Sequence, residues 1–184
     1  MPSRYISRDG GILADRFTDG PYIFQNVHTL GGAARHTAAH TALLCAAAKS
    51  LFGFDPEITA DELRRRIARL TEACRMPSRV SVRAVVRLYP TGSIEIACDE
   101  PSIYAGYVLR SLRPDAICLR MAPPLPSLPT SAAEHTRLLA DTMAHTRGAR
   151  TAILTDSDGT VISESAQPIF IVNGYTCLLY TSPS

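Results

Sequence analysis

Lysine is almost absent from this sequence, since Lys49 is the only one among 19 basic residues. No apolar run reaches the roughly 18 residues that a membrane helix requires, so we expect no transmembrane span. The polar stretch Met1–Phe17 lacks the apolar centre of a signal peptide. Because no Cys-x-x-Cys pair occurs among the five cysteines, we expect reduced thiols and a cytoplasmic protein.

The bulk composition is that of an ordinary globular chain. Hydrophobic residues make up 46% and charged residues 20% of the 184 positions. A net charge of +2 is too small to indicate a nucleic-acid or membrane-surface partner. The length allows one domain or two small ones.

Alternation and helical spacing predict the elements of the first 122 residues. Strands are expected over 22–30, 80–88 and 94–98, the last two joined as a hairpin through Pro90-Thr91-Gly92. Residues 104–112 and 116–121 are two further strand candidates. A buried helix is predicted over 33–51, with Leu43 and Leu44 on its packed side. A second, amphipathic helix begins with a capping box formed by Thr59 and Glu62.

The proline-rich segment 122–129 can be neither helix nor central strand, and we place a domain boundary there. The expected domains are residues 1–122 and 123–176. In the second, Ser131 and Glu134 form a capping box, and Leu138, Leu139 and Met143 supply the apolar face of the helix. Strands are predicted over 151–155, 160–163 and 169–172, with Asn173-Gly174 opening another hairpin.

The last eight residues, 177–184, read CLLYTSPS. They are similar to the conceptual translation of a sequencing adaptor, and such segments are set aside before a fold is inferred. We expect that they do not belong to the protein, that its own sequence continues beyond Thr176, and that the chain is a fragment.

The stretch 131–172 combines a helix, a tight hairpin and a third strand, the last parts reading AILTDSDGTVISESAQPIFIV. This pattern resembles the class IV aminotransferases, the fold-type IV enzymes that use pyridoxal phosphate (PLP) and include branched-chain aminotransferases, D-amino-acid aminotransferases and aminodeoxychorismate lyases. The resemblance implies an α+β fold in which an antiparallel sheet with two packed helices precedes a β-rich domain. It also implies PLP as cofactor and a homodimer.

Three positions depart from the pattern of that family. The lysine that carries PLP is expected just before the Ser131 helix, yet no register places a lysine there. An arginine cannot replace it, because a guanidinium stays protonated and does not form an imine. The family's first long helix carries a His-x-x-Arg pattern whose arginine meets the cofactor phosphate; His40 matches the histidine, but Leu43 stands in place of the arginine. Pro168 stands where an asparagine is expected.

Two residues are left as site candidates by the resemblance. Arg83 matches an arginine that faces the substrate carboxylate in several members, and Arg87 shares its strand face; the alternative is a solvent-facing or structurally paired arginine. Glu164 is the candidate for the glutamate that pairs with the cofactor ring. The direct register places Ser163 there, and only a bulge would bring Glu164 to it; otherwise Glu164 is a solvent-facing residue.

Three hypotheses about function follow. The first is a class IV aminotransferase-like protein without PLP catalysis, which keeps a small-carboxylate site at Arg83 or serves as a partner subunit. The second is an active PLP-dependent aminotransferase or lyase of amino-acid metabolism. The third is a small metal-binding or interaction module using His36 and His40, which are four residues apart on a predicted helix but lack a visible third ligand.

Overall fold

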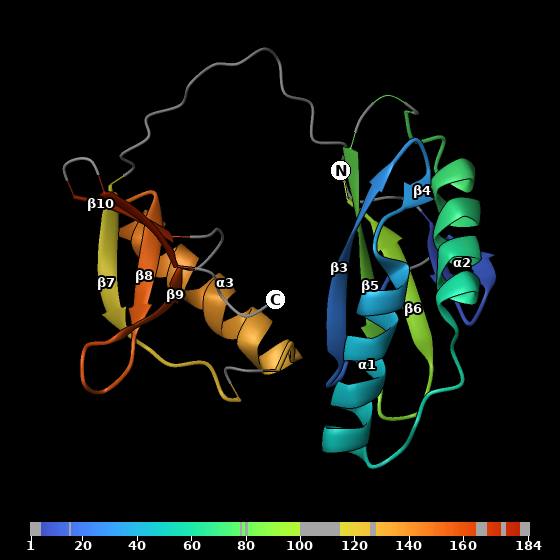
Figure 1. The fold of residues 1–184 in the computed structure, drawn as a ribbon, viewed down its shortest axis with the longest axis horizontal. Helices are drawn as coiled ribbons and strands as arrows, with labels where there is room; N and C mark the ends of the chain where they lie inside the picture. The colour runs from blue at the N-terminus through green and yellow to red at the C-terminus, as the bar shows by residue number, and fades with distance from the viewer. Residues whose placement is uncertain are drawn as a thin grey trace. The chain divides into compact units, whose positions relative to one another are not determined.

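The chain divides into two compact units, Met1–Tyr107 and Val108–Ser184 (Figure 1). A computed structural model describes residues 5–14, 16–77, 79, 81–99, 115–125, 128–164, 169–173 and 176–180, and from residue 163 onward only the backbone. The expected strand over 104–112 lies outside the described residues. The fold class is α+β, as the sequence predicts.

The first unit is built on a six-stranded antiparallel sheet with the strand order β2-β1-β6-β5-β3-β4. Its strands are β1 (Ile6–Arg8), β2 (Gly11–Leu13), β3 (Ile23–Leu30), β4 (Ala33–Ala34), β5 (Ser81–Leu88) and β6 (Ile94–Cys98). The structure confirms β3, β5, β6 and the β5–β6 hairpin. The sequence analysis does not predict the β1–β2 hairpin, which turns at Asp9 and Gly10, both with positive φ.

Helices α1 (Thr37–Phe52) and α2 (Ala60–Ala73) cover one face of this sheet (Figure 1). α1 begins four residues later than predicted, because Ala33 and Ala34 pair with the end of β3 instead of entering the helix. Its Leu44 is fully buried, but Leu43 is exposed, so the prediction that both leucines pack is wrong for Leu43.

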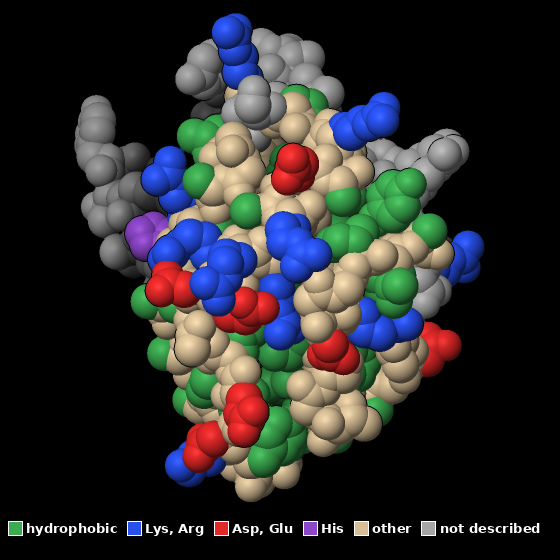
Figure 2. Space-filling view, turned by 90° about the vertical axis from the view of Figure 1, so that its right-hand side faces the viewer, with side chains coloured by type: hydrophobic (Ala, Val, Ile, Leu, Met, Phe, Trp, Pro, Cys, Tyr) green, Lys and Arg blue, Asp and Glu red, His purple; other side chains and the backbone are tan. Residues whose placement is uncertain are grey.

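The predicted amphipathic character of α2 is confirmed. Leu63, Ile67 and Leu70 are completely buried against the sheet, and the Thr59 hydroxyl accepts a hydrogen bond from the Glu62 amide. The opposite side of the helix carries charge. Figure 2 shows basic and acidic side chains interleaved there, and they form short-range ion pairs along the helix: Arg64–Asp61, Arg65–Glu62 and Arg66–Glu62.

The second unit contains β7 (Ala116–Arg120), α3 (Ser131–Thr146), β8 (Thr151–Thr155) and β9 (Val161–Glu164). β7 pairs in parallel with β8, and β9 pairs antiparallel with β8. A parallel pair requires a crossover, which α3 provides. Because β7 completes this sheet, it belongs to the second unit, and the division at Tyr107–Val108 lies earlier than the boundary expected at residues 122–123.

Alanines, and not leucines, attach α3 to its sheet. Ala133, Ala140 and Ala144 are buried, whereas Leu138 and Leu139 are exposed, which corrects the predicted apolar face. Small residues on the packed side allow the helix to lie close to β8. The cap is also one residue earlier than predicted: Thr130, and not Ser131, accepts the hydrogen bond from the Ala133 amide.

A hairpin of β10 (Ile169–Asn173) and β11 (Thr176–Tyr180) confirms the predicted turn beyond Asn173. β11 includes residues 177–180 of the segment that is similar to a translated sequencing adaptor. Cys45, Cys74, Cys98 and Cys118 are free thiols. Among the described residues, no helix combines the length and apolar character that crossing a bilayer demands.

Candidate functional site

The face of the six-stranded sheet opposite α1 and α2 carries a row of charged side chains, which we call the polar face. Strand residues alternate between faces, so Arg83, Arg87 and Glu95 lie on the side away from the helices. The register places His28 opposite Arg83, and Arg87 opposite Glu95. The register therefore brings His28 next to Arg83, and Glu95 next to Arg87, on one surface.

Arg83 is exposed on the polar face, with 59% of its side chain accessible. Its Nε donates a hydrogen bond to the Asp99 carboxylate, with 2.5 Å between the two atoms. The neighbouring His28 contacts Ser81, with Nδ1 and Oγ 2.9 Å apart. A carboxylate ligand would have to displace Asp99 from Arg83, and both partners are accessible enough for that exchange.

Arg87 lies on the same face as Arg83, as the sequence analysis expects. Its guanidinium carbon lies 4.0 Å from the ring centroid of Phe17 and 4.0 Å from that of Tyr22. Cation–π contacts with two rings hold the cation in one place. Arg87 is therefore a fixed positive charge on the polar face, four residues along β5 from the more accessible Arg83.

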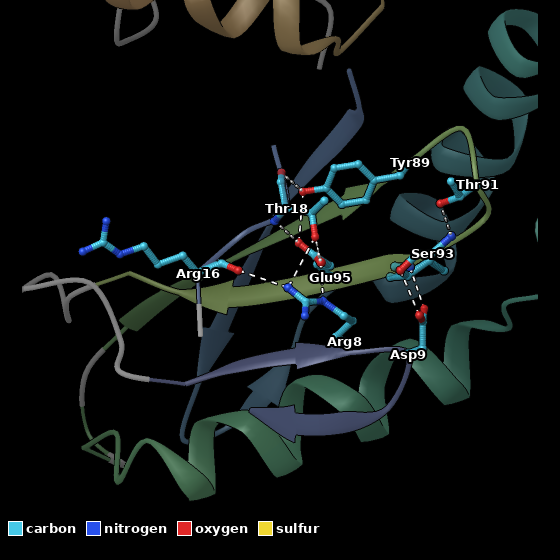
Figure 3. A network of polar contacts seen from close by, with 9 residues as sticks. Arg8, Asp9, Arg16, Thr18, Tyr89, Thr91, Ser93 and Glu95 are labelled. Carbon is cyan, nitrogen blue, oxygen red and sulfur yellow. Dashed lines mark hydrogen bonds and ion pairs between the residues drawn. The ribbon is translucent and has the colours of Figure 1, made fainter. Parts of the chain in front are cut away.

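Glu95 is a buried carboxylate that the sequence analysis does not identify, and it is only 1% exposed (Figure 3). Arg8 Nε and Thr18 Oγ1 each donate to its Oε1 at 2.5 Å. The Thr18 amide and the Tyr89 hydroxyl donate to its Oε2 at 2.8 and 3.0 Å. On the sequence, Glu95 is an ordinary outward residue of an alternating strand; its partners lie up to 87 positions away, so no local signal identifies it.

The cluster shifts the ionisation of its own members. Burial alone would raise the pKa of Glu95, but the hydrogen bonds from Thr18, Arg8 and Tyr89 outweigh it and hold that pKa below its usual value. Burial, followed by the bond to Glu95, raises the pKa of Tyr89 to about 12. Glu95 thus stays ionised and ties the segment around Thr18 to the sheet. Beside this segment lies a shallow hollow of about 240 Å³ lined by Tyr89 and Thr18.

The position before α3 is filled by Thr130, which is buried and engaged as the helix cap. Lys49 lies elsewhere, in the last turn of α1, where its side chain is 70% exposed and its Nζ is 3.0 Å from Asp55 Oδ2. Neither residue offers an amine at the start of α3.

Two other expected cofactor positions belong to the second unit. Glu164 pairs in register with Ile153, and a bulge lies between the pairs Leu154–Ser163 and Thr155–Val161. The strand thus has the irregularity that the sequence analysis required for Glu164 to replace Ser163, although its side chain is outside the described part. Pro168 lies outside the described residues.

Within the described part of the chain, His36 and His40 do not form a site with a third ligand. His40 Nδ1 is 2.8 Å from Gln25 Oε1, a bond that occupies one ring nitrogen. Burial, followed by the nearby His36, lowers the pKa of His40. No group of three or more potential ligands is present among the described residues.

Comparison with solved structures shows which proteins share this fold. The chain is similar to a branched-chain aminotransferase from Thermoproteus uzoniensis in complex with norvaline, with a TM-score of 0.71 and 20% identity over 94% of this chain. It is also similar to an aminotransferase from Brucella abortus bound to PLP, with a TM-score of 0.71 and 13% identity over 94% of the chain. A fold IV transaminase from Curtobacterium pusillum is similar as well, with a TM-score of 0.70 and 16% identity over 95% of this chain.

The chain spans 66%, 69% and 67% of the lengths of these three proteins. No family model matches the sequence. No curated protein matches it either. At such low identity the agreement is one of chain path, strand order and helix placement, and it confirms the predicted fold: the chain has the fold of the class IV, or fold-type IV, aminotransferases.

Proposed function

We propose that this chain is a class IV aminotransferase-like protein that does not carry out PLP chemistry and that binds a small carboxylate on the polar face. One observation supports the proposed absence of PLP chemistry. Thr130 caps α3 where the resemblance places the PLP lysine, while the chain's lysine is exposed in α1 and paired with Asp55. The described residues therefore do not fit a PLP anchored through lysine.

The position corresponding to the phosphate-binding arginine supports the same conclusion. Leu43 takes that position, and it is an exposed apolar side chain on α1. A leucine offers no hydrogen bond to a phosphate. The loss of amine and guanidinium together removes both an anchor and a counter-charge for PLP.

A titration with PLP tests this part, and the single lysine allows a clean control. The variant Lys49→Arg has no lysine and keeps a cation beside Asp55. We expect the full chain and this variant to give the same spectrum with PLP, with no band from a lysine-bound cofactor. A band that saturates in the wild type and is missing from Lys49→Arg would overturn the proposal in favour of an active PLP enzyme.

The carboxylate part depends on Arg83 and its exchangeable partner Asp99. Arginine binds carboxylates in a two-pronged geometry. Asp99 competes with the ligand, because it already accepts a hydrogen bond from Arg83.

Thermal unfolding in the presence of succinate tests this site. We expect the succinate-dependent rise in unfolding temperature to fall in Arg83→Ala and to increase in Asp99→Asn, where the competing carboxylate is removed. Arg69→Ala, on the exposed side of α2, is the matched control and should behave as the wild type. An unchanged response in both Arg83→Ala and Asp99→Asn would contradict the site.

By the resemblance to the class IV aminotransferases we also propose a homodimer, to be checked by sedimentation.

A further inference from the structure

Residues 17–21, which we call the strap, lead into β3 without forming a helix or a strand. Thr18, Asp19, Gly20 and Pro21 are exposed to solvent. Within the described part of the chain, the strap makes no backbone–backbone hydrogen bond to any other element. A segment without such pairing opens at a lower free-energy cost than the sheet beside it. The strap is therefore held in place by its contacts with side chains.

The polar contacts of the strap converge on the buried carboxylate of Glu95 (Figure 3). The Thr18 amide donates to Glu95 Oε2 at 2.8 Å, and the Thr18 hydroxyl donates to Oε1 at 2.5 Å. The Tyr89 hydroxyl lies 2.9 Å from the Thr18 carbonyl oxygen and 3.0 Å from Glu95 Oε2, so it shares one proton between the strap and the carboxylate. Hydrogen bonds to an ionised carboxylate are stronger than those between neutral groups. Glu95 is therefore the group on which the attachment of the strap depends.

Phe17, the first residue of the strap, lies over the Arg87 guanidinium on the polar face. The guanidinium carbon is 4.0 Å from the Phe17 ring centroid and 4.0 Å from that of Tyr22. Tyr22 is buried and makes edge contacts with Tyr89 and Phe24, with ring centroids 5.9 and 6.4 Å apart. Phe17 is only partly buried and belongs to the strap. A displacement of the strap therefore removes one ring from Arg87 and leaves the other in place.

We propose that the strap is a lid over Arg87 and that Glu95 is its latch. In the closed form Arg83 is the more accessible arginine on this face of β5, and opening makes Arg87 accessible to solvent and to anions as well. Gly20 lies near the end of the strap with a φ of 135°, which residues with a side chain rarely adopt, and it allows the chain to turn there. The open form is the minor one, because forming it breaks the hydrogen bonds to Glu95. The lid does not depend on the carboxylate site proposed at Arg83.

Modification by phenylglyoxal, a reagent for accessible guanidinium groups, tests the lid in the 184-residue chain. Peptide mapping gives separate rates for Arg87 and for the exposed Arg83, which is the internal reference. In the wild type we expect Arg87 to react more slowly than Arg83. Glu95→Gln removes the charge that binds Thr18, so the Arg87 rate should rise roughly tenfold while the Arg83 rate stays unchanged. Hydrogen exchange at the Thr18 amide should accelerate by a similar factor.

Two substitutions at Thr18 repeat the test without changing Glu95. Thr18→Val removes the hydroxyl donor and keeps the shape, so the Arg87 rate should rise by a smaller factor, whereas Thr18→Ser keeps the hydroxyl and should behave as the wild type. Leu70→Ala controls for a general loss of stability, because it weakens the core on the other face of the sheet and should leave the Arg87 rate unchanged. The proposal fails if Glu95→Gln and Thr18→Val do not raise the Arg87 rate, or if Leu70→Ala raises it as much as they do.

Discussion

The six-stranded sheet has a covered face, on which α1 and α2 pack, and the polar face on its other side. The same strands supply both faces, but the two have opposite chemistry. On β5, Val82, Ala84 and Val86 are buried beneath the helices, whereas Arg83 and Arg87 project from the other side. The covered face follows from alternation within one strand. The polar face depends on partners distant in sequence, such as Arg8 and Thr18 around Glu95. The scaffold is thus encoded locally, and the candidate site by long-range contacts.

The largest loss of stability is expected at Leu70, where α2 packs on the covered face of the sheet. Leu70→Ala removes a fully buried side chain between α2 and the sheet and should lower the free energy of unfolding by about 3 kcal/mol. Chemical denaturation measures this value, and the neighbouring exposed Arg69→Ala should change it by no more than about 0.5 kcal/mol. Equal effects at both positions would mean that α2 does not pack as described.

The next largest effect is expected at Glu95 on the polar face. Glu95→Gln keeps the shape but removes the charge that Arg8 and Thr18 bind, and should cost about 2 kcal/mol of unfolding free energy at pH 7. Glu72→Gln, on an exposed part of α2, is the control. A Glu95→Gln variant as stable as the wild type would show that the cluster contributes no net stability.

The stability difference between the wild type and Glu95→Gln should also depend on pH. Because the pKa of folded Glu95 is lower than normal, its contribution is complete above the unfolded pKa and is lost as the pH falls through the folded pKa. The stability difference between wild type and Glu95→Gln should be widest near neutral pH and should narrow as the pH falls below the ordinary glutamate pKa of about 4.3 toward the lower pKa of folded Glu95. A stability difference between the two proteins that widens as the pH falls would contradict this prediction.

A smaller effect is expected where Thr130 caps α3. Thr130→Ala removes the acceptor for the Ala133 amide and should cost about 1 kcal/mol, while Thr130→Ser keeps the hydroxyl and should restore most of it. Comparing the two by denaturation tests the cap position. If alanine and serine give the same stability, Thr130 is not the cap.

The smallest effect on stability is expected at Arg83. Its ion pair with Asp99 is solvent-exposed, so Arg83→Ala should change the unfolding free energy by less than about 0.5 kcal/mol. A loss well above this value would assign Arg83 a structural role and weaken the binding proposal.

Local patterns predicted most of the scaffold, because alternation in β5 and helical spacing in α2 follow from single elements. The Asp9-Gly10 dipeptide is a hairpin signal that would have located β1 and β2. The seam of α3 was mispredicted, because Leu138 and Leu139 are more apolar than the alanines that pack. Close helix–sheet approach selected small residues there. Glu95 could not be found, because its hydrogen-bond partners come from other elements.

The central claim is that this scaffold lacks the amine that anchors PLP, and reduction with borohydride tests it directly. The 184-residue chain is incubated with PLP, treated with borohydride and analysed by intact mass and peptide mapping. We predict that the chain keeps its unmodified mass apart from the trace labelling expected of an exposed amine such as Lys49. Stoichiometric attachment of the cofactor to Lys49 would contradict the account.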